Sequence, residues 1–257
     1  MTTARAVLAL LVLATGVRSD EIPLENRRSS YDTMAPETRA MQDDDGANPG
    51  MFWVLDGETL WSQKAGETKK SCADCHGDAR TGMKDVAARH PAFDPARGKV
   101  VDIEDRVNIC RAERQNAMPF PRESKELLAL AAFIARQSKG APIIVADDDR
   151  TRREIEIGRG IWNRRQGQLN LSCANCHDDN WGRKLAGATL PQAHPTGYPV
   201  YRLEWQTMGS LQRRLRNCLT GMRAQSWAYG SEEFAALGLF LAWRARGMPM
   251  DAPGVRP

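Results

Sequence analysis

Hydrophobic residues recur along this chain at helical spacing, whereas strand-like alternation of Val, Ile or Thr with polar residues is scarce. Two apolar helix faces each run to a cysteine: Ile103, Val107 and Cys110 in one stretch, and Met208, Leu211, Leu215 and Cys218 in the other. We therefore expect a mainly α protein in which each of these two helices ends at its cysteine.

Further helices are predicted on either side of these two. Short helices are expected to carry Trp61 and Trp162, and amphipathic helices are expected to follow Ser124 and Ser231, which are good helix caps. Loops rich in Pro and Gly separate the helices. The predicted order of elements is the same in both halves of the chain.

The two halves also match in sequence, which indicates an internal duplication. Four pairs of segments carry the match: 57–61 with 158–162 at an offset of 101, 90–95 with 194–199 (His90 with His194) at 104, Cys110 with Cys218 at 108, and 124–133 with 231–240 at 107. The small changes of offset indicate insertions in loops.

The duplication predicts two tandem domains, residues 51–142 and 150–257. A helix breaker at 140–142 and a run of aspartates at 147–149 mark the link between them. Residues 20–50 are expected to form an irregular N-terminal extension.

Each half contains one Cys-x-x-Cys-His sequence, made of Cys72, Cys75 and His76 and of Cys173, Cys176 and His177. This is the attachment sequence of c-type haem, because two thiols at this spacing can bond to the two vinyl groups of a porphyrin and the histidine can bind the iron. A four-cysteine zinc site is the alternative, but the pairs lie 101 residues apart and the histidines would be unexplained. The motifs predict two covalent haems.

Three residue types could provide the second axial ligand of each haem: cysteine, methionine and histidine. Cys110 and Cys218 are the only cysteines outside the motifs and lie at equivalent positions. Met118 competes in the first half; in the second half its equivalent is Gln225, and Met222 is a poorer substitute. His90 and His194 precede prolines in loops. The pattern favours cysteine, with a disulfide between Cys110 and Cys218, or simple burial, as the non-ligating alternative.

Residues 1–19 have the organisation of a secretory signal peptide: Arg5, an apolar run over 6–14 and small residues near 17–19. The apolar run is too short to cross a bilayer, and no later segment is apolar enough. We expect an exported protein without a membrane span, in the periplasm, where thiols can be oxidised.

The composition is that of a globular protein, with 42% hydrophobic and 26% charged residues. The formal net charge of +4 falls to +2 without residues 1–19, and about four haem propionates would cancel that remainder. The charge therefore gives no indication of nucleic-acid binding.

Charge is distributed unequally between the two halves. Residues 58–122 contain 12 basic and 10 acidic residues, whereas the equivalent residues 159–223 contain 10 basic and 3 acidic. Arg214 lies one helical turn before Cys218. Arg106 is placed likewise before Cys110, but Asp102, Glu104 and Asp105 are expected to surround it. A cationic environment favours a thiolate and attracts anions, so the second half is the candidate active site; a solvated arginine-rich face is the alternative.

The two motifs, the two additional cysteines and the sequence Arg-Leu-Arg-Asn-Cys-Leu-Thr-Gly-Met-Arg at 214–223 resemble the dihaem form of the SoxA family over essentially the whole mature chain. The resemblance implies two cytochrome c-like domains. It also implies an L-cysteine S-thiosulfotransferase that joins thiosulfate oxidatively to a cysteine of the SoxY carrier protein.

The resemblance further implies site residues and partners. Cys72, Cys75, His76 and Cys110 would serve the first haem, and Cys173, Cys176, His177 and Cys218 the second. Cys218 would be the catalytic cysteine, carried as a persulfide, and Arg214 would bind thiosulfate. The partners would be a SoxX-like monohaem cytochrome c, the SoxYZ carrier and an electron-accepting cytochrome c. A dihaem electron-transfer protein without its own substrate is the alternative, followed by a dihaem peroxidase.

Overall fold

The computed structural model describes residues 21–257, so the expected signal peptide, residues 1–19, lies outside the described part. The helices are α1 (Pro36–Asp43), α2 (Met51–Ser62), α3 (Ala73–His76), α4 (Ala79–Gly82), α5 (Ile103–Arg114), α6 (Lys125–Arg136), α7 (Asp149–Asn163), α8 (Cys173–His177), α9 (Leu211–Gly221) and α10 (Glu232–Arg244). The strands are β1 (Ala92–Asp94), β2 (Lys99–Val101), β3 (Lys184–Leu185), β4 (Ala188–Thr189), β5 (Val200–Arg202), β6 (Thr207–Gly209) and β7 (Gly254–Arg256). The prediction of a mainly α protein with minor strands is confirmed.

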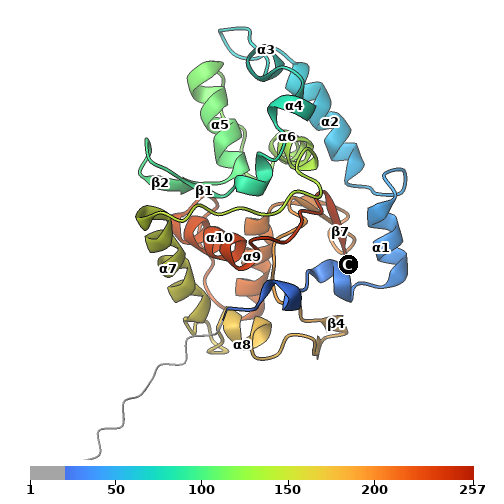
Figure 1. Ribbon diagram of the computed structural model, residues 1–257, viewed down its shortest axis with the longest axis vertical. Helices are drawn as coiled ribbons and strands as arrows, with labels where there is room; N and C mark the ends of the chain where they lie inside the picture. Colours follow the sequence, from blue (N-terminus) through green and yellow to red (C-terminus); the bar gives the residue numbers. More distant parts are fainter. Residues whose placement is uncertain (1–20) are drawn as a thin grey trace, which may run out of the picture.

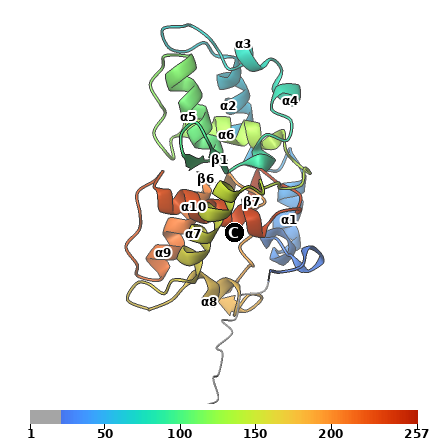
Figure 2. The same cartoon turned by 60° about the vertical axis from the view of Figure 1, so that its left-hand side comes forward.

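The duplication is visible in the order and packing of the elements (Figure 1). Each unit has a tryptophan-bearing helix (α2 or α7), a motif helix (α3 or α8), a hairpin (β1–β2 or β5–β6), a cysteine-bearing helix (α5 or α9) and a central helix (α6 or α10). The motif helices α3 and α8 lie at opposite ends of the molecule, and the two units meet in its middle (Figures 1 and 2). The four motif cysteines therefore cannot form one zinc site.

A glycine allows the tryptophan-bearing helix to pack tightly on the central helix in each unit. A Cβ atom at Gly57 would lie 2.2 Å from the carbonyl oxygen of Ala129, and one at Gly158 would lie 2.2 Å from that of Ala236. Only a residue without a Cβ atom permits this approach. The matching glycines thus preserve the same helix crossing in both units.

The central helices begin as predicted and are buried more completely than predicted. Ser124 accepts a hydrogen bond from the backbone of Leu127, and Ser231 accepts one from Phe234. In α6, every residue from 127 to 135 is buried. The expected amphipathic character is therefore wrong for this helix, because it is enclosed on all sides by neighbouring elements.

The hairpins correct the alignment of the two units. Strand β1 pairs with β2 so that Asp94 lies opposite Lys99, and β5 pairs with β6 so that Arg202 lies opposite Thr207. The offset in this region is therefore 108 residues, not 104. The position equivalent to His90 is Tyr198, and the predicted equivalence of His90 and His194 is wrong.

The helices that carry the two additional cysteines continue beyond them. Helix α5 runs to Arg114 and α9 runs to Gly221, so Cys110 and Cys218 lie in the last turns and do not end the helices. The predicted end was wrong because the residues that follow each cysteine also adopt helical geometry.

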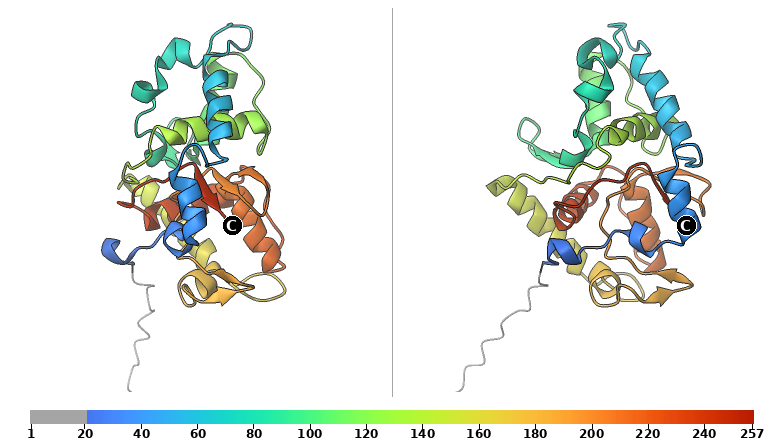
Figure 3. Two further views of the ribbon diagram at one scale, coloured as in Figure 1. Left: turned by 90° about the vertical axis from the view of Figure 1, so that its right-hand side faces the viewer. Right: turned by 45° about the vertical axis from the view of Figure 1, so that its right-hand side comes forward.

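The N-terminal extension is more regular than predicted. It contains α1 and lies against the second unit, with α1 beside β7 (Figure 3). The side chain of Gln42 accepts a hydrogen bond of 2.9 Å from the backbone of Val255, and it also accepts one from Arg256. These contacts with the end of the chain explain why a polar segment is ordered.

The main core crosses the boundary between the units. Residues of α6 pack together with Met208, Ala242 and Met248 of the second unit. The expected link also runs beside the end of the chain, where the backbone of Ile143 donates to Met248. The main core of the first unit therefore extends into the second unit, which also has a core of its own around Trp162 and Phe240. Within residues 21–257, no helix is both long enough and apolar enough to cross a membrane.

Candidate haem and active sites

The Cys-x-x-Cys-His sequences form single helical turns that are capped from within the chain. Ser71 and Asp74 exchange hydrogen bonds of 2.7 and 3.1 Å at the start of α3, and Ser172 and Asn175 do the same at the start of α8. Residues three apart in a helix lie on one face. The two thiols of each motif are therefore presented together, as attachment to one porphyrin edge requires.

The motif histidines are oriented by a tryptophan and, in the second unit, by a carbonyl group. The ring of Trp61 lies 5.7 Å from that of His76, and the ring of Trp162 lies 5.6 Å from that of His177. Nδ1 of His177 lies 2.7 Å from the carbonyl oxygen of Pro191. A carbonyl oxygen only accepts, so Nδ1 carries the proton and Nε2 is left to bind a metal.

Each additional cysteine is placed with the haem motif of its own unit. Cys110 lies close enough to Cys72 and Cys75 for their charges to interact. Cys218 interacts likewise with Cys173, and its thiol is hydrogen-bonded to His177. All six cysteines are free, and the alternative of a Cys110–Cys218 disulfide is not formed. Two thiols for the porphyrin, an imidazole and a further thiol suit a covalent haem in each unit.

The other candidate ligands have different surroundings. Met118 is 83% exposed, whereas Met222 is buried in a small cluster with Leu219 and Phe234. His90 directs Nδ1 to the carbonyl oxygen of Val86 at 2.9 Å. His194 contacts Gln192, and burial followed by the charges of Arg244 and Arg27 lowers its pKa to about 3. His90 is therefore bonded to a backbone carbonyl group, whereas His194 bonds to Gln192 through Nε2 only and its buried Nδ1 has no hydrogen-bond partner in the described structure.

The two additional cysteines differ in electrostatic environment. Burial raises the pKa of the Cys110 thiol, and the charges of Arg106 and Arg114 offset only part of this effect. Burial also acts to raise the pKa of Cys218. There, however, the hydrogen bond to His177 and the charge of Arg214 outweigh it and hold the pKa below its ordinary value. A thiolate is thus favoured at Cys218 and disfavoured at Cys110, although both positions lie four residues after an arginine.

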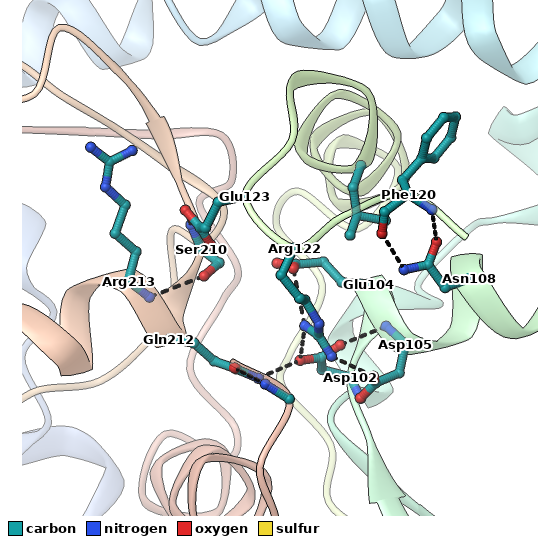
Figure 4. Close-up of polar contacts among 12 residues, drawn as sticks. Asp102, Glu104, Asp105, Asn108, Phe120, Arg122, Glu123, Ser210, Gln212 and Arg213 are labelled. Carbon is teal, nitrogen blue, oxygen red and sulfur yellow. Dashed lines mark hydrogen bonds and ion pairs between the residues drawn. The ribbon is translucent and has the colours of Figure 1, made fainter. Parts of the chain in front are cut away.

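The acidic residues of the first unit are arranged differently from the prediction. Asp102, Glu104 and Asp105 surround Arg122 and not Arg106, with distances of 2.8 and 3.0 Å from Arg122 to the first two (Figure 4). This cluster lies where the units meet, and the side chain of Gln212 in α9 donates to Asp102 at 3.1 Å. Arg106 points elsewhere on α5 and pairs with Asp94 at 2.8 Å.

Arg202 is the site residue that sequence reasoning missed. It lies at the end of β5, and its charge acts on Cys218 together with that of Arg214. Under the offset of 104, Arg202 had no notable counterpart. The correct offset of 108 pairs it with Asp94 and would have shown a reversal of charge.

Comparisons with known proteins agree with this geometry. The family model described as SoxA/TsdA, cytochrome c domain, matches residues 56–143 and again residues 157–250. The chain is 36% identical to the L-cysteine S-thiosulfotransferase subunit SoxA of Rhodovulum sulfidophilum, over 93% of this chain and 82% of that protein. It is 35% identical to the protein of the same name from Pseudaminobacter salicylatoxidans, over 91% of this chain and 82% of that protein.

A solved structure extends the likeness to three dimensions. The crystal structure of SoxXA from P. pantotrophus superposes with a TM-score of 0.86 at 33% sequence identity, covering 90% of this chain and 87% of that one. Since a family model matches both units and the relatives cover most of the chain, the protein belongs to the SoxA family of c-type cytochromes and carries covalently bound haem.

Proposed function

We propose that this chain is the catalytic subunit of an L-cysteine S-thiosulfotransferase, in which thiosulfate is joined to a cysteine thiol of a SoxY-type carrier. The new bond links the outer sulfur of thiosulfate to the cysteine sulfur. Its formation releases the thiol proton and two electrons. The names of the relatives support this activity, and two electrons must have an acceptor beside the reacting sulfur.

We assign the residues of each haem from their placement. Cys72 and Cys75 would attach the first haem, and His76 and Cys110 would bind its iron. Cys173 and Cys176 would attach the second haem, and His177 and Cys218 would bind its iron. Haem supplies an electron acceptor next to the sulfur. The domain limits of 51–142 and 150–257 follow the same assignment, with the shared core at their boundary.

The observation that carries the proposal is the contrast between Cys218 and Cys110. Cys218 lies beside His177, Arg214 and Arg202, and these groups lower the pKa of its thiol. A nucleophilic sulfur that can be carried as a persulfide needs this anionic character. Arg214 binds thiosulfate, because a guanidinium offers two directed donors to an oxyanion.

Location and partners follow from the same assignment. Residues 1–19 direct export, so the mature protein works in the periplasm as a heterodimer with a SoxX-like monohaem cytochrome c. The name of the superposed complex, SoxXA, supports that partner. The SoxYZ carrier supplies the cysteine to be modified, and a separate cytochrome c takes the electrons.

Spectra and intact mass of the native holoprotein test the site assignment. We expect two haems per chain, added sulfur on the peptide that contains Cys218, and low-spin ferric spectra with thiolate features. Substitution of either Cys110 or Cys218 by methionine should change the features of one haem only. Spectra of Met/His-ligated iron in the unmodified protein would refute thiolate ligation and favour Met118 in the first unit.

A further inference from the structure

Arg202 takes the place in the second unit that an acidic residue holds in the first. Strands β1 and β5 end at Asp94 and Arg202, and both residues begin the turn of an antiparallel hairpin with the same register. The helix after each hairpin carries Arg106 or Arg214 at equivalent positions. The duplication thus contains the same structural position with opposite charge.

In the first unit this position neutralises the arginine before the cysteine. Oδ2 of Asp94 accepts a hydrogen bond of 2.8 Å from Arg106 and lies 3.7 Å from Nε of Arg97. The side chain of Asp94 is only 10% exposed. The positive charge beside Cys110 is therefore balanced within the protein and has no need of an external anion.

In the second unit the corresponding guanidinium groups are balanced only in part, because the exposed Glu204 is the only acidic partner of the two within the described residues. Arg214 forms no ion pair among residues 21–257. The pKa of Arg202 is lowered by its own burial and, to a smaller extent, by the positive charge of Arg214. One nitrogen of Arg202 donates to Glu204 at 2.8 Å, but Nε is buried without a hydrogen-bond partner in the described structure. Trp205 replaces Arg97 and packs against the guanidinium of Arg202, with the ring centroid 5.2 Å away.

We infer that Arg202 is a second substrate-binding residue, and that Arg202 and Arg214 together hold the sulfonate oxygens of thiosulfate beside Cys218. The inference rests on the proposed function and adds a residue to it. Two neighbouring, partly buried cations repel each other, and a dianion between them removes that repulsion while accepting hydrogen bonds from the guanidinium groups. The reversal of charge from Asp94 to Arg202 then explains why only one of two similar units binds substrate.

Steady-state kinetics of the complete holoprotein complex, with the carrier and cytochrome c present, test this role. Arg202→Gln keeps the length and polarity of the side chain but removes its charge. We expect it to raise the KM for thiosulfate about 10-fold or more, the effect of losing hydrogen bonds to a charged group. Arg202→Asp should raise the KM at least as much, because an aspartate there would pair with Arg214 as Asp94 pairs with Arg106. Arg202→Lys should raise the KM less than either of these substitutions.

Competition by sulfate separates anion binding from chemistry. Sulfate is a dianion without a sulfane sulfur, so it should inhibit the unmodified enzyme competitively, and its inhibition constant should rise in the Arg202 variants in step with KM. The control is Arg153→Gln, an exposed arginine on α7, which should leave both constants unchanged. A haem count of two identifies variants that have folded, and the lysine variant serves where the aspartate variant has not.

Unchanged KM and sulfate inhibition in Arg202→Gln and Arg202→Lys, together with a large loss in Arg214→Ala, would overturn the role of Arg202 and leave the proposed function standing. If Arg214→Ala also left both constants unchanged, the proposed site at Cys218 would itself be wrong.

Discussion

At the scale of single residues, the second unit differs from the first in how arginine charge is used. Arg106 and Arg214 occupy the same position before a cysteine, but Arg106 is paired with Asp94 and Arg214 has no acidic partner in the described part of the chain. The sequence predicted the cysteines, the motif histidines and the excess of positive charge. It did not predict which carboxylates neutralise Arg106, because that depends on a contact between a hairpin and a helix.

Arg214→Ala tests anion capture at this scale. Loss of a charge-assisted hydrogen bond costs about 1.5–3 kcal/mol, so kcat/KM for thiosulfate should fall roughly 10- to 150-fold. Arg214→Lys should recover only part of the loss, since a point charge lacks the planar fork. Arg106→Ala, the matched change in the first unit, should mainly affect the first haem. Equal losses of thiosulfate activity in the two alanine variants would contradict the asymmetry.

At the scale of elements, the sequence predicted the equivalent helices of the two units correctly where several residues match. It misled where the match rested on one or two residues. The glycines and tryptophans of α2 and α7 have the same contacts in both units. His90 and His194 share only a following proline, and the strand register places Tyr198 at the equivalent position instead. Helix α1 escaped prediction because its stability comes from contacts with the C-terminal strand.

Two glycines in α7 provide a matched test of helix packing. Gly158→Ala would place a methyl group against the backbone of α10, and we expect it to lower the free energy of unfolding by about 1–3 kcal/mol. Gly160 is exposed, and a Cβ there would meet nothing within 4 Å. Gly160→Ala should therefore raise stability by about 0.5–1 kcal/mol through helix propensity. Urea unfolding followed by circular dichroism measures both, and destabilisation of similar size in the two variants would show that close packing is not the cause.

At the scale of the whole molecule, the two units share a core while their haem motifs lie at opposite ends (Figures 1 and 2). This arrangement does not suit a simple electron-transfer pair, which needs haems near each other. Sequence alone could predict two units but not their relative placement, since the contacts that join them are between residues far apart in the chain. Gln212, for example, reaches the Arg122 cluster across the boundary (Figure 4).

The Arg122 cluster makes stability depend on pH. Burial, together with the charge of Asp102, raises the pKa of Glu104 to about 8 despite the opposing charge of Arg122. Between the ordinary carboxyl pKa and that value, the folded protein keeps a proton that the unfolded chain has released. The free energy of unfolding should therefore fall as the pH rises through this window.

Glu104→Gln removes this dependence, because glutamine resembles the protonated carboxyl group and is already present at the equivalent position, Gln212. The variant should unfold at a urea concentration close to that of the unmodified protein at pH 5, and should be more stable by about 1–3 kcal/mol at pH 8.5. Gln212→Glu should have the opposite effect at high pH. A constant stability difference between unmodified protein and Glu104→Gln across the window would show that Glu104 does not retain its proton.

The central claim is that the second unit is the catalytic one and that the sulfur atom of Cys218 takes part in the reaction. The most direct test is thiosulfate-dependent reduction of cytochrome c by the complete complex, with the carrier present, in Cys218→Ala and Cys110→Ala. Haem staining and intact mass must show both haems in each variant. We expect Cys218→Ala to be inactive while Cys110→Ala keeps much of its activity with an altered first haem. Full activity in Cys218→Ala with both haems bound would show that the second unit only relays electrons.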